Sequence, residues 1–516
     1  MKARPFPLHP LSFVCTALLL LLCLAGPAAA QDAAPRISSL TFIGVRALPV
    51  SALQKATASF VGAAADAATL AALRKRVQQV YDERGLGLVS VMPPAALPAS
   101  DGTVLVRVSE LKVSLVEVIG ADRSALSRLP ALVPGQAPQF EALTRQLFLF
   151  NDNPRRKAAL DFSPGEGEQV TAKLTVTEQA LAYGSLTIDN SGSDQTGLGR
   201  ARLSAGHGDL FGRGWVGEAQ LTTSFDGSTV RQALGRLSVP LIATGGTLDF
   251  SLDHSRSELG SVLAFNSISG RSTGAHLGYR HALLRASDRE RFLTVALDQR
   301  QYDDVYDFAG TNLGSSVATR PLTLGYSALA RGRWITQVSL GLTGNIPGGG
   351  DNASANYAAS RFGAKTQWLR GNASAFALRP LGSGWQFSAR LNGQYSDDAL
   401  ISGEQFRTGG SGGLRGLIEG EVAGDSGVSG GLELVAAWPL PLQGFVFTEA
   451  TRATRNRRTV GSPDVLAATT AGFGLRSPGE SRISFELSLG HVLDTKNLPE
   501  SEPGDSRVHA SARLSF

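Results

Sequence analysis

The chain of 516 residues has very little cysteine, and its two cysteines, Cys15 and Cys23, both precede residue 31. The rest of the chain can therefore form neither a disulfide nor a thiolate metal site. Histidine is also scarce, and the pair His276 and His281 does not have the spacing of metal ligands on a helix. No glycine-rich phosphate loop with its lysine is present. The sequence thus predicts no enzyme, no cofactor, no metal site and no catalytic residue.

Long apolar runs are missing after the first 30 residues. Residues 11–25 are apolar, follow Lys2 and Arg4, and precede three alanines at 28–30, which is the pattern of a secretory signal peptide. This apolar core is too short to span a bilayer, so we predict that residues 1–30 are removed. No later stretch reaches the roughly 18 apolar residues of a transmembrane helix. An exported chain of this kind is either soluble in or beyond the periplasm or is a β-barrel.

Neither sign of charge dominates. The formal net charge is +5, and removal of Lys2 and Arg4 lowers it to +3. Such a balance gives no argument for nucleic acid as a partner.

Residues 31–179 predict two small α+β units, 31–110 and 111–179, in which helical and strand periodicities alternate. The predicted elements are a strand at 40–43, a helix from Leu70 to Tyr81 and strands at 89–91 and 104–108 in the first unit, and a strand at 116–118, a helix from Phe140 to Phe150 and a strand at 174–176 in the second. We interpret both units as having a strand-helix-strand-strand order, and each is near the lower size limit for independent folding. Neither unit carries a nucleophile, a base or a metal constellation.

From about residue 181 apolar and polar residues alternate, as in strands with one apolar face. Clear cases are residues 385–392, 483–489 and 508–516. Strands of about nine to ten residues, joined alternately by short turns and long polar loops, are typical of a transmembrane barrel with lipid outside and a wet lumen. At roughly 20 residues per strand and connection, residues 180–516 predict about 16 antiparallel strands, which leaves room for an aqueous channel.

One loop stands out inside this barrel. Residues 403–431 contain eleven glycines, too many for a helix or a regular strand. Residues 409–417 (GGSGGLRGL) place a single cation, Arg415, on a backbone that is free to adopt unusual conformations. Taken alone, this run favours a flexible hairpin whose arginine faces water.

Four motifs, taken in order, change that interpretation. They are residues 149–157 (LFNDNPRRK) followed by Pro164 and Gly165, residues 189–193 (DNSGS) with Thr196 and Gly197, the loop residues Leu414, Arg415, Gly416 and Leu417, and the segment from Phe447 to Glu449. They resemble, respectively, the second POTRA domain, the first barrel strand, the lumen loop tip and the inner-wall acidic element of the two-partner secretion transporters. That family exports haemolysins and filamentous haemagglutinins, and the resemblance covers nearly all of residues 35–516.

The resemblance implies an outer-membrane translocase of the Gram-negative envelope. Its periplasmic POTRA domains, residues 31–110 and 111–179, would capture an adhesin- or haemolysin-like exoprotein by strand addition. The barrel, residues 180–516, would then export this partner in extended form. A barrel-assembly factor, which usually has more than two POTRA units, and a passive porin, which has none, are the alternative functions.

The resemblance also implies that loop 403–431 folds back into the lumen. Arg415 is then predicted to pair with Glu449, because a guanidinium fork matches a carboxylate, and to pack on Phe447 and Phe445. The alternative is that Glu449 pairs with Arg390 or Arg476.

Two residues depart from the family pattern: Leu417 replaces an aromatic residue and Glu449 an aspartate. Too few residues separate residue 31 from the first predicted strand for the plug helix of some relatives. We therefore do not extend the plug-dependent gating of those relatives to this chain.

Further partners are expected at the membrane. The basic cluster Arg452, Arg455, Arg457 and Arg458 falls in a predicted external loop. It is interpreted either as solvated loop charge or as a contact with lipopolysaccharide phosphates. Phe516 ends an alternating strand, which predicts recognition by the barrel-assembly machinery during insertion among outer-membrane lipids.

Overall fold

The computed structural model describes residues 36–516 except 87–88, 93–94, 97–101, 194–195, 226–229, 264–265, 309–310, 313, 438–441, 458–462 and 480. The predicted signal peptide, residues 1–30, and Arg458 of the basic cluster therefore lie outside the described residues. The chain forms two compact units, one with residues up to Val116, 131–141 and 162–172, and one with 117–130, 142–161 and 173–516. Among the described residues, no helix is both long and apolar enough to cross a membrane.

The first sheet is centred on β4 (Thr103–Glu110), which pairs in parallel with β1 (Ser39–Ile43) and antiparallel with β2 (Val89–Val91) and β3 (Ala95–Ala96). Helix α3 (Ala67–Asp82) buries Leu73, Val77, Val80 and Tyr81 in the same core as Val104, Val106 and Val108 of β4. Asp66 caps α3 by accepting a hydrogen bond from the Thr69 amide at 2.7 Å, and this bond lowers the pKa of the Asp66 carboxyl. The sequence pattern missed α2 (Val50–Thr57), because Leu53 and Thr57 are its only buried residues and make no apolar stripe.

The second sheet has the order β5-β7-β6, with β5 at Lys112–Ile119, β6 at Arg156–Pro164 and β7 at Gln169–Glu178. Helix α4 (Phe140–Asn151) follows the short helix η2 (Arg123–Arg128) and buries Leu143, Leu149 and Phe150. The helix predicted from Phe140 to Phe150 is thus present, and β6 stands where the predicted order has a strand between the helix and the last strand, although the sequence pattern did not indicate its residues.

The remaining described residues form a closed antiparallel barrel of sixteen strands, because β15, β16 and β17 all pair with β14 and count as one interrupted strand. Its strands are β8 (Ala182–Asp189), β9 (Arg200–Leu210), β10 (Trp215–Ser224), β11 (Val230–Leu241), β12 (Gly246–Leu263), β13 (Asn266–Arg285), β14 (Arg289–Phe308), β15 (Thr311–Asn312), β16 (Ser316–Thr319), β17 (Pro321–Arg331), β18 (Ile335–Asn345), β19 (Leu369–Gly382), β20 (Trp385–Tyr395), β23 (Ser426–Ala437), β24 (Gln443–Thr454), β25 (Val465–Arg476), β26 (Ile483–Lys496) and β27 (Ser506–Ser515). The last strand, β27, pairs with the first, β8, and closes the barrel.

The outside of the barrel is apolar. Leu252, Leu324, Leu391, Phe473 and Ile483 are each more than half exposed, although they are large hydrophobic side chains. Such a surface suits hydrocarbon rather than water, and it confirms the predicted outer-membrane barrel class.

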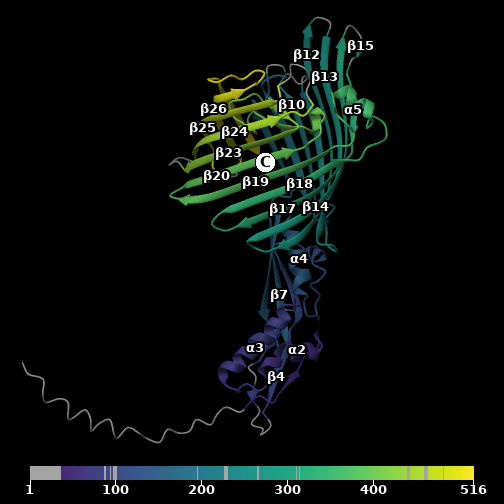
Figure 1. Cartoon of the computed structure of the whole chain (residues 1–516). Coiled ribbons are helices and arrows are strands. Elements are labelled where there is room, and N and C mark those ends of the chain that lie inside the picture. Colours follow the sequence, from purple (N-terminus) through teal and green to yellow (C-terminus); the bar gives the residue numbers. More distant parts are fainter. Residues whose placement is uncertain are drawn as a thin grey trace, which may run out of the picture. The chain divides into compact units, whose positions relative to one another are not determined.

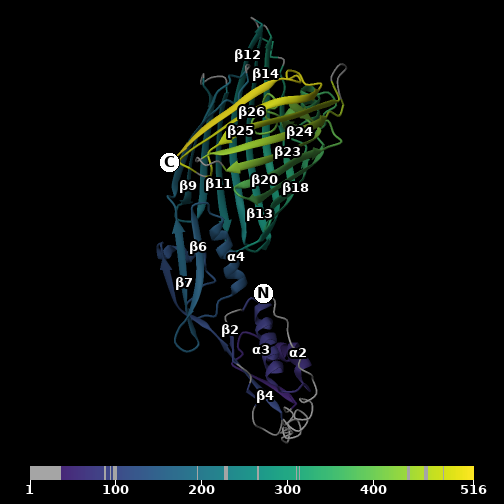
Figure 2. The ribbon, with the colours of Figure 1, turned by 90° about the vertical axis from the view of Figure 1, so that its left-hand side faces the viewer.

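Three strands are much longer than the nine to ten residues expected. Strands β12, β13 and β14 have 18, 20 and 20 residues and extend beyond the rim of their neighbours (Figures 1 and 2). A strand needs only about 9–11 residues to cross the bilayer. Their outer parts carry Arg256, Arg271 and Asp303, which are cross-strand partners, so these parts lie outside the hydrocarbon.

Candidate functional site

A glycine-rich loop lies between β20 and β23. It contains the hairpin β21 (Phe406–Thr408) and β22 (Val422–Gly424), and residues 409–421 form its tip. The predicted loop extended to residue 431, but β23 already begins at Ser426. The predicted loop was too long because it included glycines of strand β23. Gly427 leaves space for the ring of Phe406, and Gly431 leaves space for Arg390 and Glu449.

Leucines anchor the tip of this loop. Leu414 and Leu417 are completely buried and belong to one apolar cluster with Phe406, Val422, Ala453, Leu466, Ala468 and Val492. Because the last four residues lie on β24, β25 and β26, the loop packs against the inside of the barrel wall. Leu417, which replaces an aromatic residue, therefore serves as an apolar anchor.

Arg415 is 5% exposed, and the structure brings its side chain to Glu449 of β24. Its Nε and Nη2 donate to Glu449 Oε1 at 3.0 and 2.7 Å, and its backbone amide donates to Oε2 at 2.6 Å. The Cζ atom lies 3.5 Å from the centre of the Phe447 ring and 5.4 Å from that of Phe445. The guanidinium is thus held by charge and by two aromatic faces.

The predicted pair is part of a larger network. Arg390 of β20 also forms an ion pair with Glu449 and donates to the carbonyl of Gly413 at 2.7 Å. Glu433 of β23 accepts from Arg415 Nη1 at 3.0 Å and pairs with Arg476 at 2.9 Å. Arg390 therefore shares Glu449 with Arg415, whereas Arg476 pairs with another acid.

Two wall residues that the sequence analysis did not single out hold the loop tip. The Gly416 amide donates to His509 Nε2 of β27 at 3.1 Å, and Gly416 has a φ of 106° that favours glycine. Gly490 of β26 lies so close that an added Cβ would meet the Arg415 carbonyl carbon and the Gly416 nitrogen at 2.4 Å. A glycine on the inward face of an alternating strand was the available signal for such a close approach.

The base of the loop is fixed by a second acid, Asp425, which is fully buried. Its carboxylate forms a bidentate ion pair with Arg361, with Nη2 to Oδ2 at 2.8 Å, and accepts from the amides of Leu400 and Asn456 at 2.9 and 2.6 Å. Arg361 follows α5 (Ser354–Ser360) and Asn456 follows β24, so the contacts come from two other external loops and from Leu400 in the hairpin's own β20–β23 connection. Asp425 thus connects the hairpin to the surrounding loops.

His276 and His281, whose spacing did not predict a metal site, have different partners. His276 pairs with Asp298 at 3.0 Å, whereas His281 contacts Tyr279 at 3.2 Å. Residues separated by an odd number along a strand lie on opposite faces, so these two rings point to different sides of β13. Among the described residues, no group of three or more acids, histidines or cysteines is arranged to hold a metal ion.

A closed sixteen-stranded barrel with an apolar exterior and a charged loop fixed against its inner wall defines a large outer-membrane barrel, of a size that leaves room for a channel. The sequence model described as haemolysin secretion/activation protein ShlB/FhaC/HecB matches residues 170–449, more than half of the chain. The chain therefore belongs to this family, as the motifs indicated.

Individual relatives agree with this assignment. The outer membrane transporter CdiB of Dickeya dadantii (strain 3937) is 26% identical over 320 residues, and the match spans 57% of this chain and only 54% of that relative. Among solved structures, CdiB from Escherichia coli has a TM-score of 0.77 at 20% identity, covering 96% of this chain and 93% of its own. CdiB from Acinetobacter baumannii has a TM-score of 0.73 at 16% identity, covering 93% and 90%. At these identities the two structures show that the fold is shared.

Proposed function

We propose that this protein is an outer-membrane translocase that exports a partner exoprotein from the periplasm to the cell surface. The observation that carries the proposal is a family match over residues 170–449, together with a loop that buried charges hold inside the barrel. The relative from Dickeya dadantii is named an outer membrane transporter, which supports the same location and role. The exported partner is an adhesin- or haemolysin-like protein that passes in extended form.

Export of this kind involves no covalent step for the barrel to catalyse. The loop tip contacts β24, β26 and β27, so it occupies part of the lumen. A chain in transit needs this space, and loop movement must break the contacts of Arg415 and Gly416. We therefore assign Arg415, Glu449 and Phe447 to a lock whose release opens the channel.

Capture of the partner is assigned to the N-terminal units, residues 31–110 and 111–179. Each unit contains a small sheet with edge strands. In the first sheet β1 and β2 flank β4, and in the second β5 and β6 flank β7. Free backbone groups on an edge strand bind an extended peptide with little dependence on its sequence. This geometry supports capture by strand addition.

Two further partners belong to the same proposal. Arg452 and Arg455 lie at the external end of β24, where lipopolysaccharide phosphates would be accessible. Insertion of the chain would use the barrel-assembly machinery, with β27 as the strand that closes the barrel on β8.

The direct test is co-expression of this chain with candidate large secreted β-rich proteins in a Gram-negative host. We expect one candidate to appear in the medium only when this chain is present, and to remain in the periplasm otherwise. Loss of other outer-membrane barrels on deletion of the gene would indicate an assembly factor instead. Small-solute uptake with no exported protein would indicate a passive porin.

A further inference from the structure

The outer surface of the barrel has a groove of its own. Strands β20, β23 and β24 line this groove, which has a volume of 530 Å³. Leu391, Val428 and Leu432 line it and are about half exposed, as expected of apolar side chains that face lipid. Thr448 and Ala450 of β24 also line it, and their small side chains leave it unfilled. The groove is therefore an apolar depression in the lipid-facing surface.

This groove lies on the outer side of the wall that carries the lock. Successive side chains of a strand point to opposite faces, so Thr448 and Ala450 face lipid whereas Phe447 and Glu449 face the loop. Arg390 and Glu449 border the groove only from within the wall, because they pair with each other on the lumen side. Neither of these two charges is available to a ligand outside.

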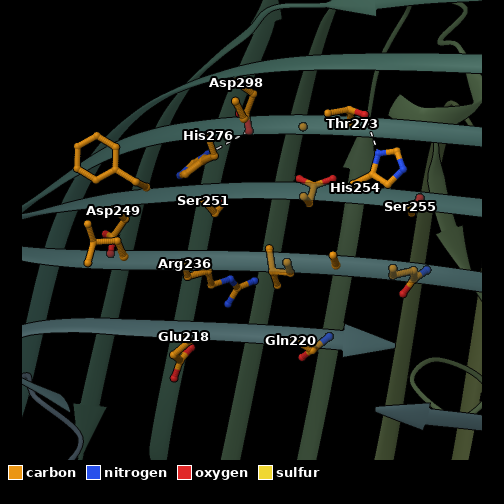
Figure 3. A pocket seen from close by; sticks show the side chains of 18 of the residues that line it. Glu218, Gln220, Arg236, Asp249, Ser251, His254, Ser255, Thr273, His276 and Asp298 are labelled. Atoms are coloured by element: carbon orange, nitrogen blue, oxygen red, sulfur yellow. Dashed lines mark hydrogen bonds and ion pairs between the residues drawn. The ribbon is translucent and has the colours of Figure 1, made fainter. Parts of the chain in front are cut away.

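The chemistry of this groove differs from that of a larger cavity on the lumen side. That cavity has a volume of 940 Å³, lies over β10–β14 and is lined by charges of both signs, among them Glu218, Arg236 and Asp298 (Figure 3). Its mixture of signs favours no single class of small ligand. The outer groove is apolar, and the charged side chain that borders it from outside is a cation, Arg452.

A second cation stands in the same row as Arg452. Arg452 of β24 and Lys496 of β26 are both register partners of Ala467 on β25, and both are exposed. Two strand spacings separate them, about 10 Å, so their long side chains can reach one anion between them. Among the described residues, neither side chain makes a hydrogen bond or an ion pair. Both cations are therefore available to an anion outside the barrel.

The other charges nearby do not cancel this pair. Arg455 donates through Nε to the Ala423 carbonyl at 3.2 Å, so it belongs to the base of the loop. Asp494 is an exposed acid two residues before Lys496, and in the described part of the chain it pairs with neither cation. Two cations and one acid leave the rim of the groove with a net positive charge.

The groove and the cations have the dimensions of a lipid in one leaflet. Below Arg452, the outward positions of β24 run through Ala450 and Thr448 to Val446, which is 53% exposed and lies beyond the groove. At about 3.4 Å for each of roughly six residues, this distance is about 20 Å along the strand, or about 14 Å across a bilayer at a tilt of about 45°. Half of the hydrocarbon core is about 15 Å. An acyl chain can thus lie in the groove while its headgroup meets the cations.

We propose that this groove binds one lipopolysaccharide molecule of the outer leaflet, with an acyl chain along β24 and a phosphate between Arg452 and Lys496. The inference rests on the lipopolysaccharide contact included in the proposed function, and it adds the acyl groove and Lys496. Charge-assisted hydrogen bonds from cations to phosphate are strong. An acylated phosphate uses both parts of the site, whereas a free phosphate uses only the cations.

The test measures lipid binding by the purified full chain in a non-ionic detergent. Diphosphoryl lipid A is titrated in, and bound lipid is counted by native mass spectrometry. Arg452→Gln combined with Lys496→Gln removes the cations, and Ala450→Phe fills the groove. The matched controls are Arg291→Gln, an exposed arginine at the periplasmic end of β14, and Ala275→Phe, an exposed alanine on the lipid-facing side of β13. Heat-modifiable migration on a gel shows that each variant forms the barrel.

We expect one tightly bound lipid A per chain, with affinity about tenfold lower in the double-cation variant and in Ala450→Phe, and unchanged in both controls. Phosphatidylethanolamine and the deacylated sugar bisphosphate should bind more weakly than lipid A. Equal binding of the three probes, or lipid A binding that neither variant weakens, would overturn the site.

The outcome separates this inference from the translocase function, because lipid binding needs no exoprotein. Lipid A bound as expected by a chain on which no export depends would overturn the translocase function and support the site. Unchanged lipid binding in folded variants that still export a partner would overturn the lipid site alone.

Discussion

At the scale of the residue, the candidate site depends on one carboxylate with several partners. Glu449 accepts from the backbone and side chain of Arg415 and also pairs with Arg390. The sequence could predict the pair, because the loop motif and the acidic wall motif stand in a recognisable order. It could not predict that Arg390 joins them, because this depends on the register between β20, β23 and β24.

Because Arg390 and Arg415 share Glu449, the loss of Glu449 and the loss of Arg415 have unequal effects on the lock. Arg415→Ala leaves Glu449 paired with Arg390, whereas Glu449→Ala leaves Arg390 without its acid and Arg415 with Glu433 alone. Removing one partner of a buried ion pair costs about 3–5 kcal/mol. We expect both variants to raise channel conductance and impair export, Glu449→Ala more strongly, and the double variant to be little worse than Glu449→Ala.

Planar-bilayer conductance and exoprotein in the medium are the measurements. Arg513→Ala on β27 is the control, because Arg513 makes no ion pair among the described residues. Independent sites have additive effects, so additive losses, or normal export by Arg415→Ala, would show that Arg415 is not part of a lock.

Gly490 gives a second prediction at this scale. A methyl group there would lie 2.4 Å from the backbone of the loop tip, closer than any contact the loop can accept without moving. We expect Gly490→Ala to displace the loop and raise conductance while the barrel still folds. The control is Gly235→Ala on β11, where an added Cβ meets nothing within 4 Å. Heat-modifiable migration on a gel should be the same for both variants. Equal conductance of Gly490→Ala and Gly235→Ala would contradict the inference that the close contact at Gly490 fixes the loop tip.

At the scale of the element, the sequence predicted strand alternation well, and the reason is the lipid. An apolar exterior must be continuous, so the pattern persists wherever a strand crosses the membrane. The sequence prediction failed for segments outside the membrane, namely the outer parts of β12–β14 and the short helix α2. Strand glycines such as Gly427 and Gly431 were assigned to the loop, because composition does not reveal which side chain a glycine accommodates.

Asp425 allows a prediction about the external loops. Its ion pair with Arg361 and its bond to the Asn456 amide connect two neighbouring loops to the base of the hairpin, and its bond to the Leu400 amide fixes the hairpin's own β20–β23 connection. Asp425→Asn removes the charge and one acceptor oxygen, so the partly buried Arg361 loses its counter-ion. We expect proteases added to intact cells to cleave within residues 346–368 faster in this variant. Asp397 is an exposed acid on the loop after β20, so Asp397→Asn is the control and should leave the cleavage rate unchanged. An unchanged cleavage rate in Asp425→Asn would show that the Asp425 contacts do not hold the loops.

At the scale of the whole molecule, export and membrane insertion make opposite demands on the barrel. Export through the lumen, as proposed above, would use a closed cylinder, whereas release of a chain into lipid would need the barrel to open between β8 and β27. That seam pairs residues 185–189 with 511–515, five pairs compared with eleven between β17 and β18. The seam is therefore the place where the two functions can be separated.

Ser185 and Ser515 are register partners in this seam. The neighbouring pair, Gly184 and Phe516, exchanges both backbone hydrogen bonds, so the two serines form a non-hydrogen-bonded pair, the closer kind. Ser185→Cys with Ser515→Cys should therefore form a disulfide across the seam. Because the proposed path lies inside the barrel, we expect the oxidised variant to export the partner as well as its reduced form and as either single variant. Export that stops on oxidation and returns with a reductant would mean that the seam opens during function, and the lumen path would have to be abandoned.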